Sequence, residues 1–128
     1  MAQRDCIGEG KMEKILIVDD QPNLQELFSE ELMDEGYMVE GVSNAETAKE
    51  YFRDSKPDLV VLDLYLKGFE GWDMLKDIKG KYPHLPVLIF TAYDNYADDP
   101  RASQADGYMV KDFSAVERLK EKIADLLS

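Results

Sequence analysis

Five residues whose side chains can do chemistry stand directly after short apolar runs of this 128-residue sequence: Asp19, Asp20, Asp63, Thr91 and Lys111. Carboxylates that gather at one place repel one another unless a hard cation lies among them. Mg²⁺ prefers one or two carboxylates, water and a phosphate oxygen as its ligands. A lysine adds positive charge for an anionic ligand, and a threonine hydroxyl can donate to a phosphoryl oxygen. Because a carboxylate can also be the nucleophile, these residues together predict Mg²⁺-assisted phosphoryl transfer to an aspartate.

The apolar runs in front of these residues predict the strands that position them. The runs are residues 15–18, 59–62, 87–90 and 107–110. Continuous β-branched stretches without polar alternation are typical of strands buried on both faces, as in a parallel sheet covered by helices. Ligands of such a sheet bind beyond the carboxyl ends of its strands. We therefore expect the three carboxylates, the hydroxyl and the amine to converge on one patch at that edge.

Segments with helical spacing separate the strands. Apolar residues recur at this spacing in three sets: Leu24, Leu27, Phe28 and Leu32; Leu75, Ile78 and Tyr82; and Val116, Leu119, Ile123 and Leu126. Residues 37–42 predict another strand, and residues 43–46 have the spacing of a capping box that begins another helix. The alternation predicts an α/β fold, a doubly wound five-stranded parallel sheet with right-handed crossovers. Between Thr91 and Gly107 the chain is polar, and any helix there is expected to be short and weakly docked.

Composition and charge limit the classes of partner. The formal net charge is −12, which argues against binding nucleic acid or an anionic membrane, because both need lysine and arginine contacts. With 45% hydrophobic residues the chain can bury a core, and its length suits one domain. Residues 1–12 are interpreted as a flexible tail and residues 13–128 as the domain. The longest apolar runs are too short for a bilayer span or a signal peptide, so we expect a cytoplasmic protein.

The chain resembles the CheY-like receiver domains of two-component response regulators, from about Glu13 to Leu127. The resemblance is carried by residues 14–20, residues 57–64, the glycines Gly68 and Gly71, the pair Thr91-Ala92, and residues 105–111. Each motif is weak alone, and their order and separations together are specific. The resemblance implies a flavodoxin-like fold with strand order 2-1-3-4-5.

The resemblance also implies roles for the acidic residues. Asp63 would be phosphorylated by a partner histidine kinase or phosphotransfer protein. Asp20 and Asp63, with the backbone carbonyl of Tyr65, would hold Mg²⁺, and Asp19 would act mainly through a bound water.

Three further residues would act on the phosphoryl group or respond to it. Thr91 would swing toward the phosphoryl group and Lys111 would pair with it. Tyr108 matches the switch aromatic of the family, which moves between outward and inward rotamers as Thr91 moves. That coupling would reshape the surface on which a downstream protein partner binds.

Some positions depart from the family pattern. Lys67 stands where a proline is usual, Gln104 replaces a glycine, and Asp112 follows Lys111 where the family often has a cis proline. A cis peptide without proline costs roughly 3 kcal/mol, so a trans bond or local strain is expected at Asp112. These departures leave every phosphorylation group in place, and they put the usual output surface in doubt.

Two other function classes compete with the receiver interpretation. An aspartate-nucleophile phosphatase usually carries a second acid two residues after its nucleophile, where this chain has Tyr65. A degenerate receiver would bind partners without phosphorylation. The intact acids, Thr91 and Lys111 count against it, and the altered region after Thr91 favours it. Under the receiver interpretation the chain is not an enzyme beyond self-phosphorylation from small donors and hydrolysis of its own aspartyl-phosphate.

Overall fold

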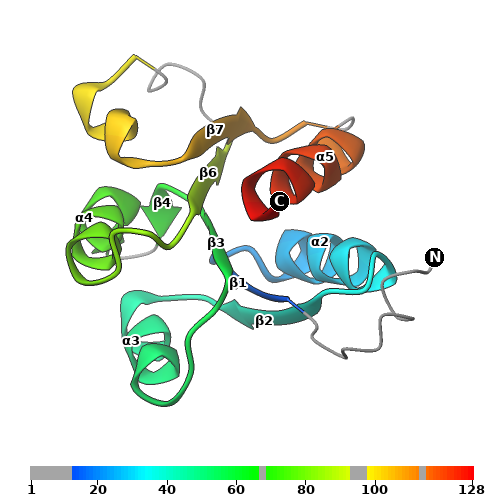
Figure 1. Ribbon diagram of the computed structural model, residues 1–128, viewed down its shortest axis with the longest axis horizontal. Coiled ribbons are helices and arrows are strands. Elements are labelled where there is room, and N and C mark those ends of the chain that lie inside the picture. The colour runs from blue at the N-terminus through cyan, green and yellow to red at the C-terminus, as the bar shows by residue number, and fades with distance from the viewer. Residues whose placement is uncertain (1–12, 67–68, 93–97, 113–114) are drawn as a thin grey trace.

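The computed structural model describes residues 13–66, 69–92, 98–112 and 115–128. Within them, one parallel sheet contains β1 (Lys14–Val18), β2 (Met38–Val42), β3 (Leu59–Leu62), β6 (Val87–Thr91) and β7 (Gly107–Val110). Helices α2 (Pro22–Asp34), α3 (Ala45–Asp54), α4 (Gly71–Lys81) and α5 (Ala115–Leu127) follow the strands along the chain (Figure 1). The spatial order β2-β1-β3-β6-β7 is the expected order 2-1-3-4-5, so the doubly wound fold is confirmed.

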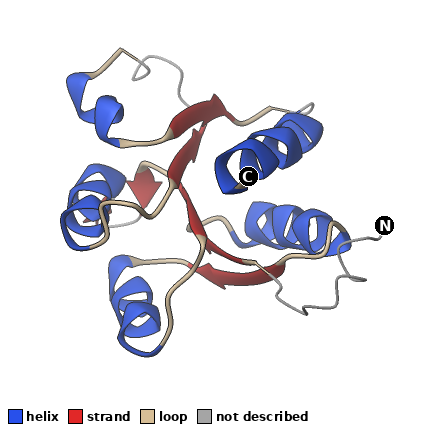
Figure 2. Ribbon diagram, viewed as in Figure 1, coloured by secondary structure: helices blue, strands red, loops and turns tan. Residues whose placement is uncertain are grey.

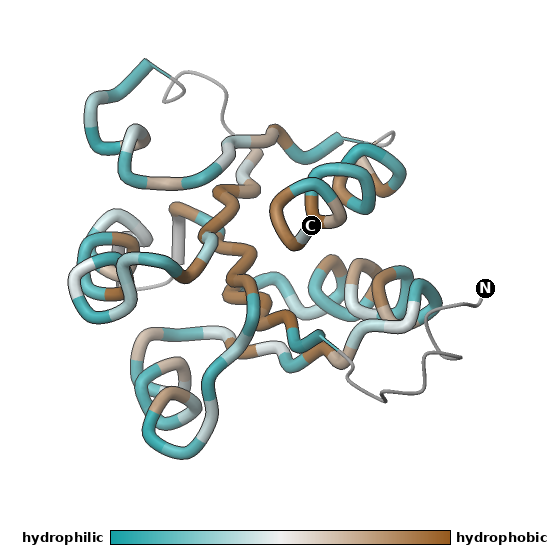
Figure 3. Tube along the Cα trace, in the orientation of Figure 1, coloured by the Kyte–Doolittle hydropathy of each residue, from teal (hydrophilic) through white to brown (hydrophobic). Residues whose placement is uncertain are grey.

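Helices cover both faces of the sheet (Figure 2). Each face has its own core of buried residues. Successive side chains of a strand point to opposite faces. Leu16 and Val18 of β1 therefore pack toward α3 and α4, while Ile15 and Ile17 pack toward α2 and α5. Every residue of β3 and β6 is buried, which explains their unbroken apolar runs. Figure 3 shows these strands as a hydrophobic centre between the helical layers. Among the described residues, no helix is long and apolar enough to cross a membrane.

Of the four apolar residues of α2 that recur at helical spacing, three pack against the core and one is exposed. Phe28 and Leu32 are buried and Leu24 packs against the same core, but Leu27 is 44% exposed. Leu24, Phe28 and Leu32 are spaced by four residues, so they share one face of the helix. Leu27 lies one residue, about 100° of rotation, away from Phe28. Helical spacing alone therefore does not place Leu27 in the core.

Two short strands follow β3. β4 (Tyr65–Leu66) and β5 (Phe69–Glu70) form a two-stranded antiparallel pair, with Lys67 and Gly68 outside the described residues. α4 then begins at Gly71, whose backbone N–H donates to the carbonyl of Leu64 at 2.8 Å. This short pair therefore returns the chain to the end of β3, directly beside Asp63.

A short 3₁₀-helix, η1 (Pro100–Gln104), stands between β6 and β7, where a short and weakly docked helix was expected. None of its residues is buried. The Arg101 guanidinium lies 4.4 Å from the centre of the Trp72 ring on α4, so a cation–π contact attaches η1 to that helix. Beyond β7, the Lys111–Asp112 peptide bond is trans.

Candidate functional site

The sheet register brings the five predicted site residues to one edge. Val18 pairs with Leu62, Leu62 with Ile89, and Thr91 with Val110, so the carboxyl ends of four strands are adjacent. The residues that immediately follow β1, β3 and β7, and the last residue of β6, therefore lie together: Asp19, Asp20, Asp63, Lys111 and Thr91. The convergence expected from the apolar runs is present in the structure.

The three carboxylates form a compact cluster. Carboxylate oxygens of Asp19, Asp20 and Asp63 all lie within 4.8 Å of one another. Asp19 is 4% exposed and Asp63 is 7% exposed, whereas Asp20 is partly exposed. Burial in a medium of low dielectric strengthens the repulsion between these charges. Such a cluster needs positive charge close by.

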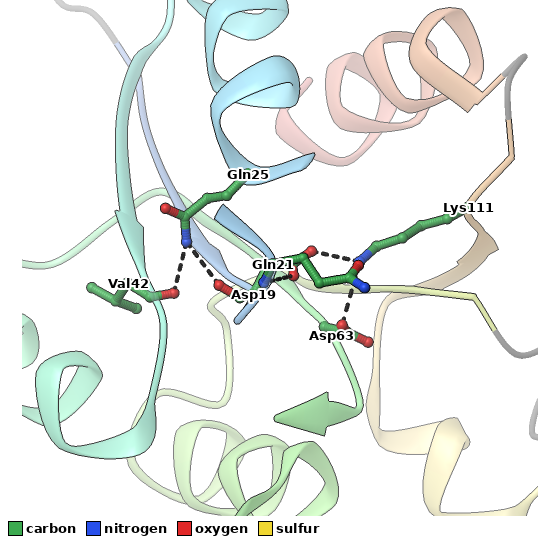
Figure 4. Close-up of polar contacts among 6 residues, drawn as sticks. All are labelled: Asp19, Gln21, Gln25, Val42, Asp63 and Lys111. Carbon is green, nitrogen blue, oxygen red and sulfur yellow. Dashed lines mark hydrogen bonds and ion pairs between the residues drawn. The ribbon is translucent and has the colours of Figure 1, made fainter. Parts of the chain in front are cut away.

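Lys111 supplies part of that charge. Its Nζ lies 2.5 Å from Oδ2 of Asp19 and 3.3 Å from Oδ2 of Asp63, and its side chain is 7% exposed (Figure 4). One ammonium thus contacts two of three clustered carboxylates. With all four groups ionised, the cluster has a formal charge of −2, from three carboxylates and one ammonium. A divalent cation would balance this charge.

Two glutamines hold the chain in place at Asp19, directly after β1. Gln21 donates its backbone N–H to Oδ1 of Asp19 at 2.9 Å. Gln25, on the first turns of α2, donates its side-chain amide to the carbonyls of Asp19 and Val42, each at 2.9 Å (Figure 4). These bonds join α2, the end of β1 and the end of β2. They fix the direction in which the Asp19 side chain leaves the sheet.

Gly41 makes the position of Gln25 possible. A Cβ added to Gly41 would lie 2.5 Å from Oε1 and 2.6 Å from Cδ of Gln25, too close for either atom. Neither residue was among the predicted site residues. The only signal in the sequence was a glycine inside a predicted strand, which often marks a close approach of another group.

A second close approach fixes the Asp63 backbone. A Cβ on Gly71 would collide with the carbonyl oxygen of Asp63 and lie 2.7 Å from the Cα of Leu64. The backbone N–H of Asp63 donates to the carbonyl of Val18 at 2.9 Å. The end of β3 is therefore held between β1 and the start of α4, which orients the Asp63 side chain toward the cluster.

Thr91 contributes a buried hydroxyl that is not hydrogen-bonded. The residue is fully buried, and its Oγ1 has no hydrogen-bond partner among the described residues. A buried polar atom without a partner costs free energy, so such an atom often marks a binding site. Its backbone carbonyl accepts from the N–H of Lys111 at 2.7 Å, which ties the two site residues together.

The two remaining predicted residues lie around this edge. Tyr108 is half-buried in β7, opposite Ile89 of β6, and packs against the core on the α3–α4 face. Tyr65 begins β4, two residues beyond Asp63. The backbone of Tyr65 is thus near the cluster in sequence, and its metal-binding role stays a prediction.

The donor set fits a hard divalent cation with an anionic ligand beside it. Three carboxylates in one cluster are the oxygen ligands that Mg²⁺ uses. The Lys111 ammonium and the unpaired Thr91 hydroxyl are hydrogen-bond donors, suited to phosphoryl oxygens. The same edge therefore offers ligands for a metal and donors for a phosphoryl group.

Comparison with known proteins identifies the family. The response regulator receiver domain family matches residues 15–124. The chain is 36% identical over 112 residues to the probable transcriptional regulatory protein TcrX of Mycobacterium tuberculosis, covering 86% of this chain and 48% of that protein. It is 34% identical over 116 residues to the two-component response regulator PhoP of Pseudomonas aeruginosa, covering 89% and 51%. The chain spans about half the length of these relatives.

Solved structures agree with the fold and the chemistry. The crystal structure of response regulator TrrA from Thermotoga maritima in complex with Mg²⁺ and BeF has 40% sequence identity and a TM-score of 0.86. The match covers 91% of this chain and 100% of the TrrA chain. A crystal structure of the histidine kinase ThkA in complex with TrrA matches with the same identity and coverage and a TM-score of 0.84.

Proposed function

Because this chain belongs to the response regulator receiver family, we propose that Asp63 is its phosphoacceptor and that a histidine kinase or phosphotransfer protein is the donor. The observation that supports this proposal most strongly is the cluster of three carboxylates around Lys111. It lies beside the Thr91 hydroxyl, which has no hydrogen-bond partner among the described residues. The TrrA structures support the proposal, since one contains Mg²⁺ and BeF and the other a histidine kinase.

The proposed reaction uses Asp63 as a nucleophile. A carboxylate oxygen attacks the phosphorus of a phosphohistidine, and a new oxygen–phosphorus bond forms as the nitrogen–phosphorus bond breaks. The imidazole nitrogen of the donor leaves with the bonding electron pair. Mg²⁺, when bound, neutralises the negative charge of the phosphoryl oxygens. Attack by water on the phosphorus later releases inorganic phosphate and a proton and restores the carboxylate.

Each neighbouring residue has a proposed role. Asp20, Asp63 and the backbone carbonyl of Tyr65 hold Mg²⁺, and Asp19 acts through a bound water. Lys111 already lies within hydrogen-bond distance of Asp63, so a small displacement of its Nζ would reach a phosphoryl oxygen on that residue.

The proposed output begins at Thr91. Its hydroxyl gains a partner when it donates to a phosphoryl oxygen, and Tyr108 on the neighbouring strand responds by moving inward. The change reaches a downstream protein through the surface around β7. We propose residues 13–128 as the domain that carries out this switching, and its intrinsic chemistry as phosphoryl acceptance and hydrolysis.

Acetyl phosphate and Mg²⁺ test the acceptor directly. Intact mass spectrometry of the incubated protein is expected to show one acid-stable, base-labile phosphoryl adduct. The Asp63→Asn variant is expected to show none. Asp58→Asn is a matched control. Asp58 is an exposed carboxylate at the opposite edge of the sheet, where it accepts a hydrogen bond from the backbone N–H of Lys14. It is expected to form the adduct as the unmodified protein does.

The other two function classes give different results in the same experiment. If the chain is a degenerate receiver, the unmodified protein forms no adduct with acetyl phosphate and Mg²⁺. A phosphatase turns over phosphate esters many times without accumulating an adduct. An adduct that persists unchanged on Asp63→Asn would contradict the assignment of the acceptor.

A further inference from the structure

A groove between α3 and α4 lies outside the phosphoryl site and shares no residue with it. Its cavity volume is about 430 Å³, and it is lined by ten residues from the two helices and the turn after α4. The volume lies within the range of small-molecule sites, roughly 300–1,000 Å³. A protein interface needs roughly 20–30 residues on each side. The dimensions therefore favour a small ligand over a macromolecule.

The wall of the groove contains two aromatic rings. The rings of Phe52 and Tyr82 are stacked, with centroids 5.4 Å apart and planes inclined by 19°. Both side chains are half-buried, and the buried side chain of Met74 lines the same groove. Stacked aromatic rings beside a thioether form an apolar surface against which another planar ring can pack.

The rim of the groove is cationic, although the whole chain has a net charge of −12. Lys49, Arg53 and Lys81 line it together with one carboxylate, that of Asp77. Among the described residues, none of these three cations forms an ion pair within 4.0 Å, and all three are exposed. Lys120, by contrast, contacts three glutamates. The cations that line the groove therefore outnumber its carboxylates by three to one, and none of them is held in an ion pair among the described residues.

We propose that this groove binds a small aromatic anion, a planar ring system carrying a carboxylate, sulfonate or phosphate group. The ring packs against Phe52 and Tyr82, and the acid group lies among Lys49, Arg53 and Lys81. Charge complementarity selects an anion, and the apolar wall selects a ring over a bare inorganic ion. The proposal is independent of phosphorylation at Asp63.

Fluorescence titration with 8-anilinonaphthalene-1-sulfonate tests the proposal on the full chain. We expect saturable binding of one probe molecule, with the amide NMR shifts concentrated in α3 and α4. A variant with Lys49→Gln, Arg53→Gln and Lys81→Gln is expected to bind about tenfold more weakly, because each exposed charge contributes modestly. The neutral analogue N-phenyl-1-naphthylamine is expected to show no such difference between the two proteins.

A second triple variant provides a control of equal charge. Lys14→Gln, Lys76→Gln and Lys122→Gln remove three positive charges outside the groove and are expected to leave probe affinity unchanged. Asp63→Asn is also expected to bind normally, which separates this site from the phosphoacceptor. Thermal unfolding checks that every variant is folded. Equal weakening in both triple variants, or probe shifts spread over other elements, would overturn the proposal.

Discussion

The two edges of the central sheet each contain a lysine–aspartate pair, but the charges at the two edges are balanced differently. At the amino edge, Lys79 Nζ lies 3.0 Å from Oδ2 of Asp106 and donates to the carbonyl of Leu85 at 3.0 Å. The same carboxylate accepts from the backbone N–H of Val87 at 2.8 Å. At the carboxyl edge, Lys111 contacts two of three clustered carboxylates.

The difference distinguishes a structural ion pair from the candidate functional site. The amino-edge pair has one positive and one negative group, and both also bond to the backbone, so it connects α4, β6 and the start of β7. Among the described residues at the carboxyl edge, three carboxylates lie around one ammonium, and the buried Thr91 hydroxyl has no hydrogen-bond partner. An excess of carboxylates and a buried polar hydroxyl favour the binding of a cation and an anionic group.

Lys111→Met is expected to cause the largest change in stability. The substitution leaves the buried carboxylates of Asp19 and Asp63 without their ammonium partner, and breaking a buried pair in this way costs about 3 kcal/mol. Urea unfolding at pH 7 without Mg²⁺ measures the loss. Added Mg²⁺ is expected to stabilise this variant more than the unmodified protein, because its cluster is more negative. A loss that Mg²⁺ does not reduce would show that packing of the lysine, not charge, is what matters.

Asp106→Asn is expected to have the next largest effect. The amide no longer pairs with the Lys79 ammonium, and the loss of a charge-assisted hydrogen bond costs about 2 kcal/mol. The same urea unfolding experiment measures it. Because the Lys79–Asp106 pair has no excess charge, Mg²⁺ is expected to leave this cost unchanged. A Mg²⁺-dependent cost would remove the distinction between the two edges.

Asp63→Asn is expected to change stability in the opposite direction. Removing one of three mutually repelling carboxylates stabilises the Mg²⁺-free protein by about 1 kcal/mol, although one contact with Lys111 becomes weaker. In excess Mg²⁺ the order reverses, because the unmodified protein gains stability by binding the ion and the variant gains less. Thermal unfolding with and without Mg²⁺ gives both comparisons. A destabilised variant in Mg²⁺-free buffer would contradict the excess-charge account.

The sequence was sufficient to predict the carboxyl edge because two simple regularities determine it. Continuous apolar runs identify strands buried on both faces, and the ends of parallel strands meet at one edge. Asp19, Asp63 and Lys111 therefore come together although up to 92 residues separate them. The same reasoning did not determine whether Leu27 is buried, because a spacing of three or four residues leaves the edge of a helical stripe undetermined.

Contacts that depend on exact tertiary placement could not be predicted. The Gln25 amide reaches the carbonyls of Asp19 and Val42 only because α2 lies close to β2 and Gly41 leaves room for it. Hydrophobic periodicity carries no information about such a polar contact. The pairing of β4 with β5 was missed for another reason, since strands of two residues are too short to show a period.

The ion pair between Asp99 and Arg101 is expected to have the smallest effect on stability. It is therefore the reference with which the pairs at the two edges of the sheet are compared. Arg101 donates from Nε and Nη2 to the two carboxylate oxygens of Asp99, at 3.0 and 2.8 Å, and its backbone N–H donates to the first of them. Together these bonds lower the pKa of Asp99 from 3.8 to about 2, with the side-chain hydrogen bonds contributing most and the backbone hydrogen bond next. A lowered pKa means that any stabilisation is present above pH 3.8 and is lost as the pH falls toward 2.

Carboxyl NMR titration of Asp99 is expected to show a midpoint near 2, and Arg101→Gln is expected to raise it while the backbone N–H keeps it below 3.8. Because Arg101 is exposed and the pair joins residues only two positions apart, Asp99→Asn is expected to leave the unfolding midpoint at pH 7 unchanged. A loss as large as that of Asp106→Asn would mean that any lysine or arginine pair in this fold stabilises equally. The effect of a pair would then not depend on whether it joins distant segments of the chain, and the contrast between the two edges would no longer support the carboxyl edge as the functional one.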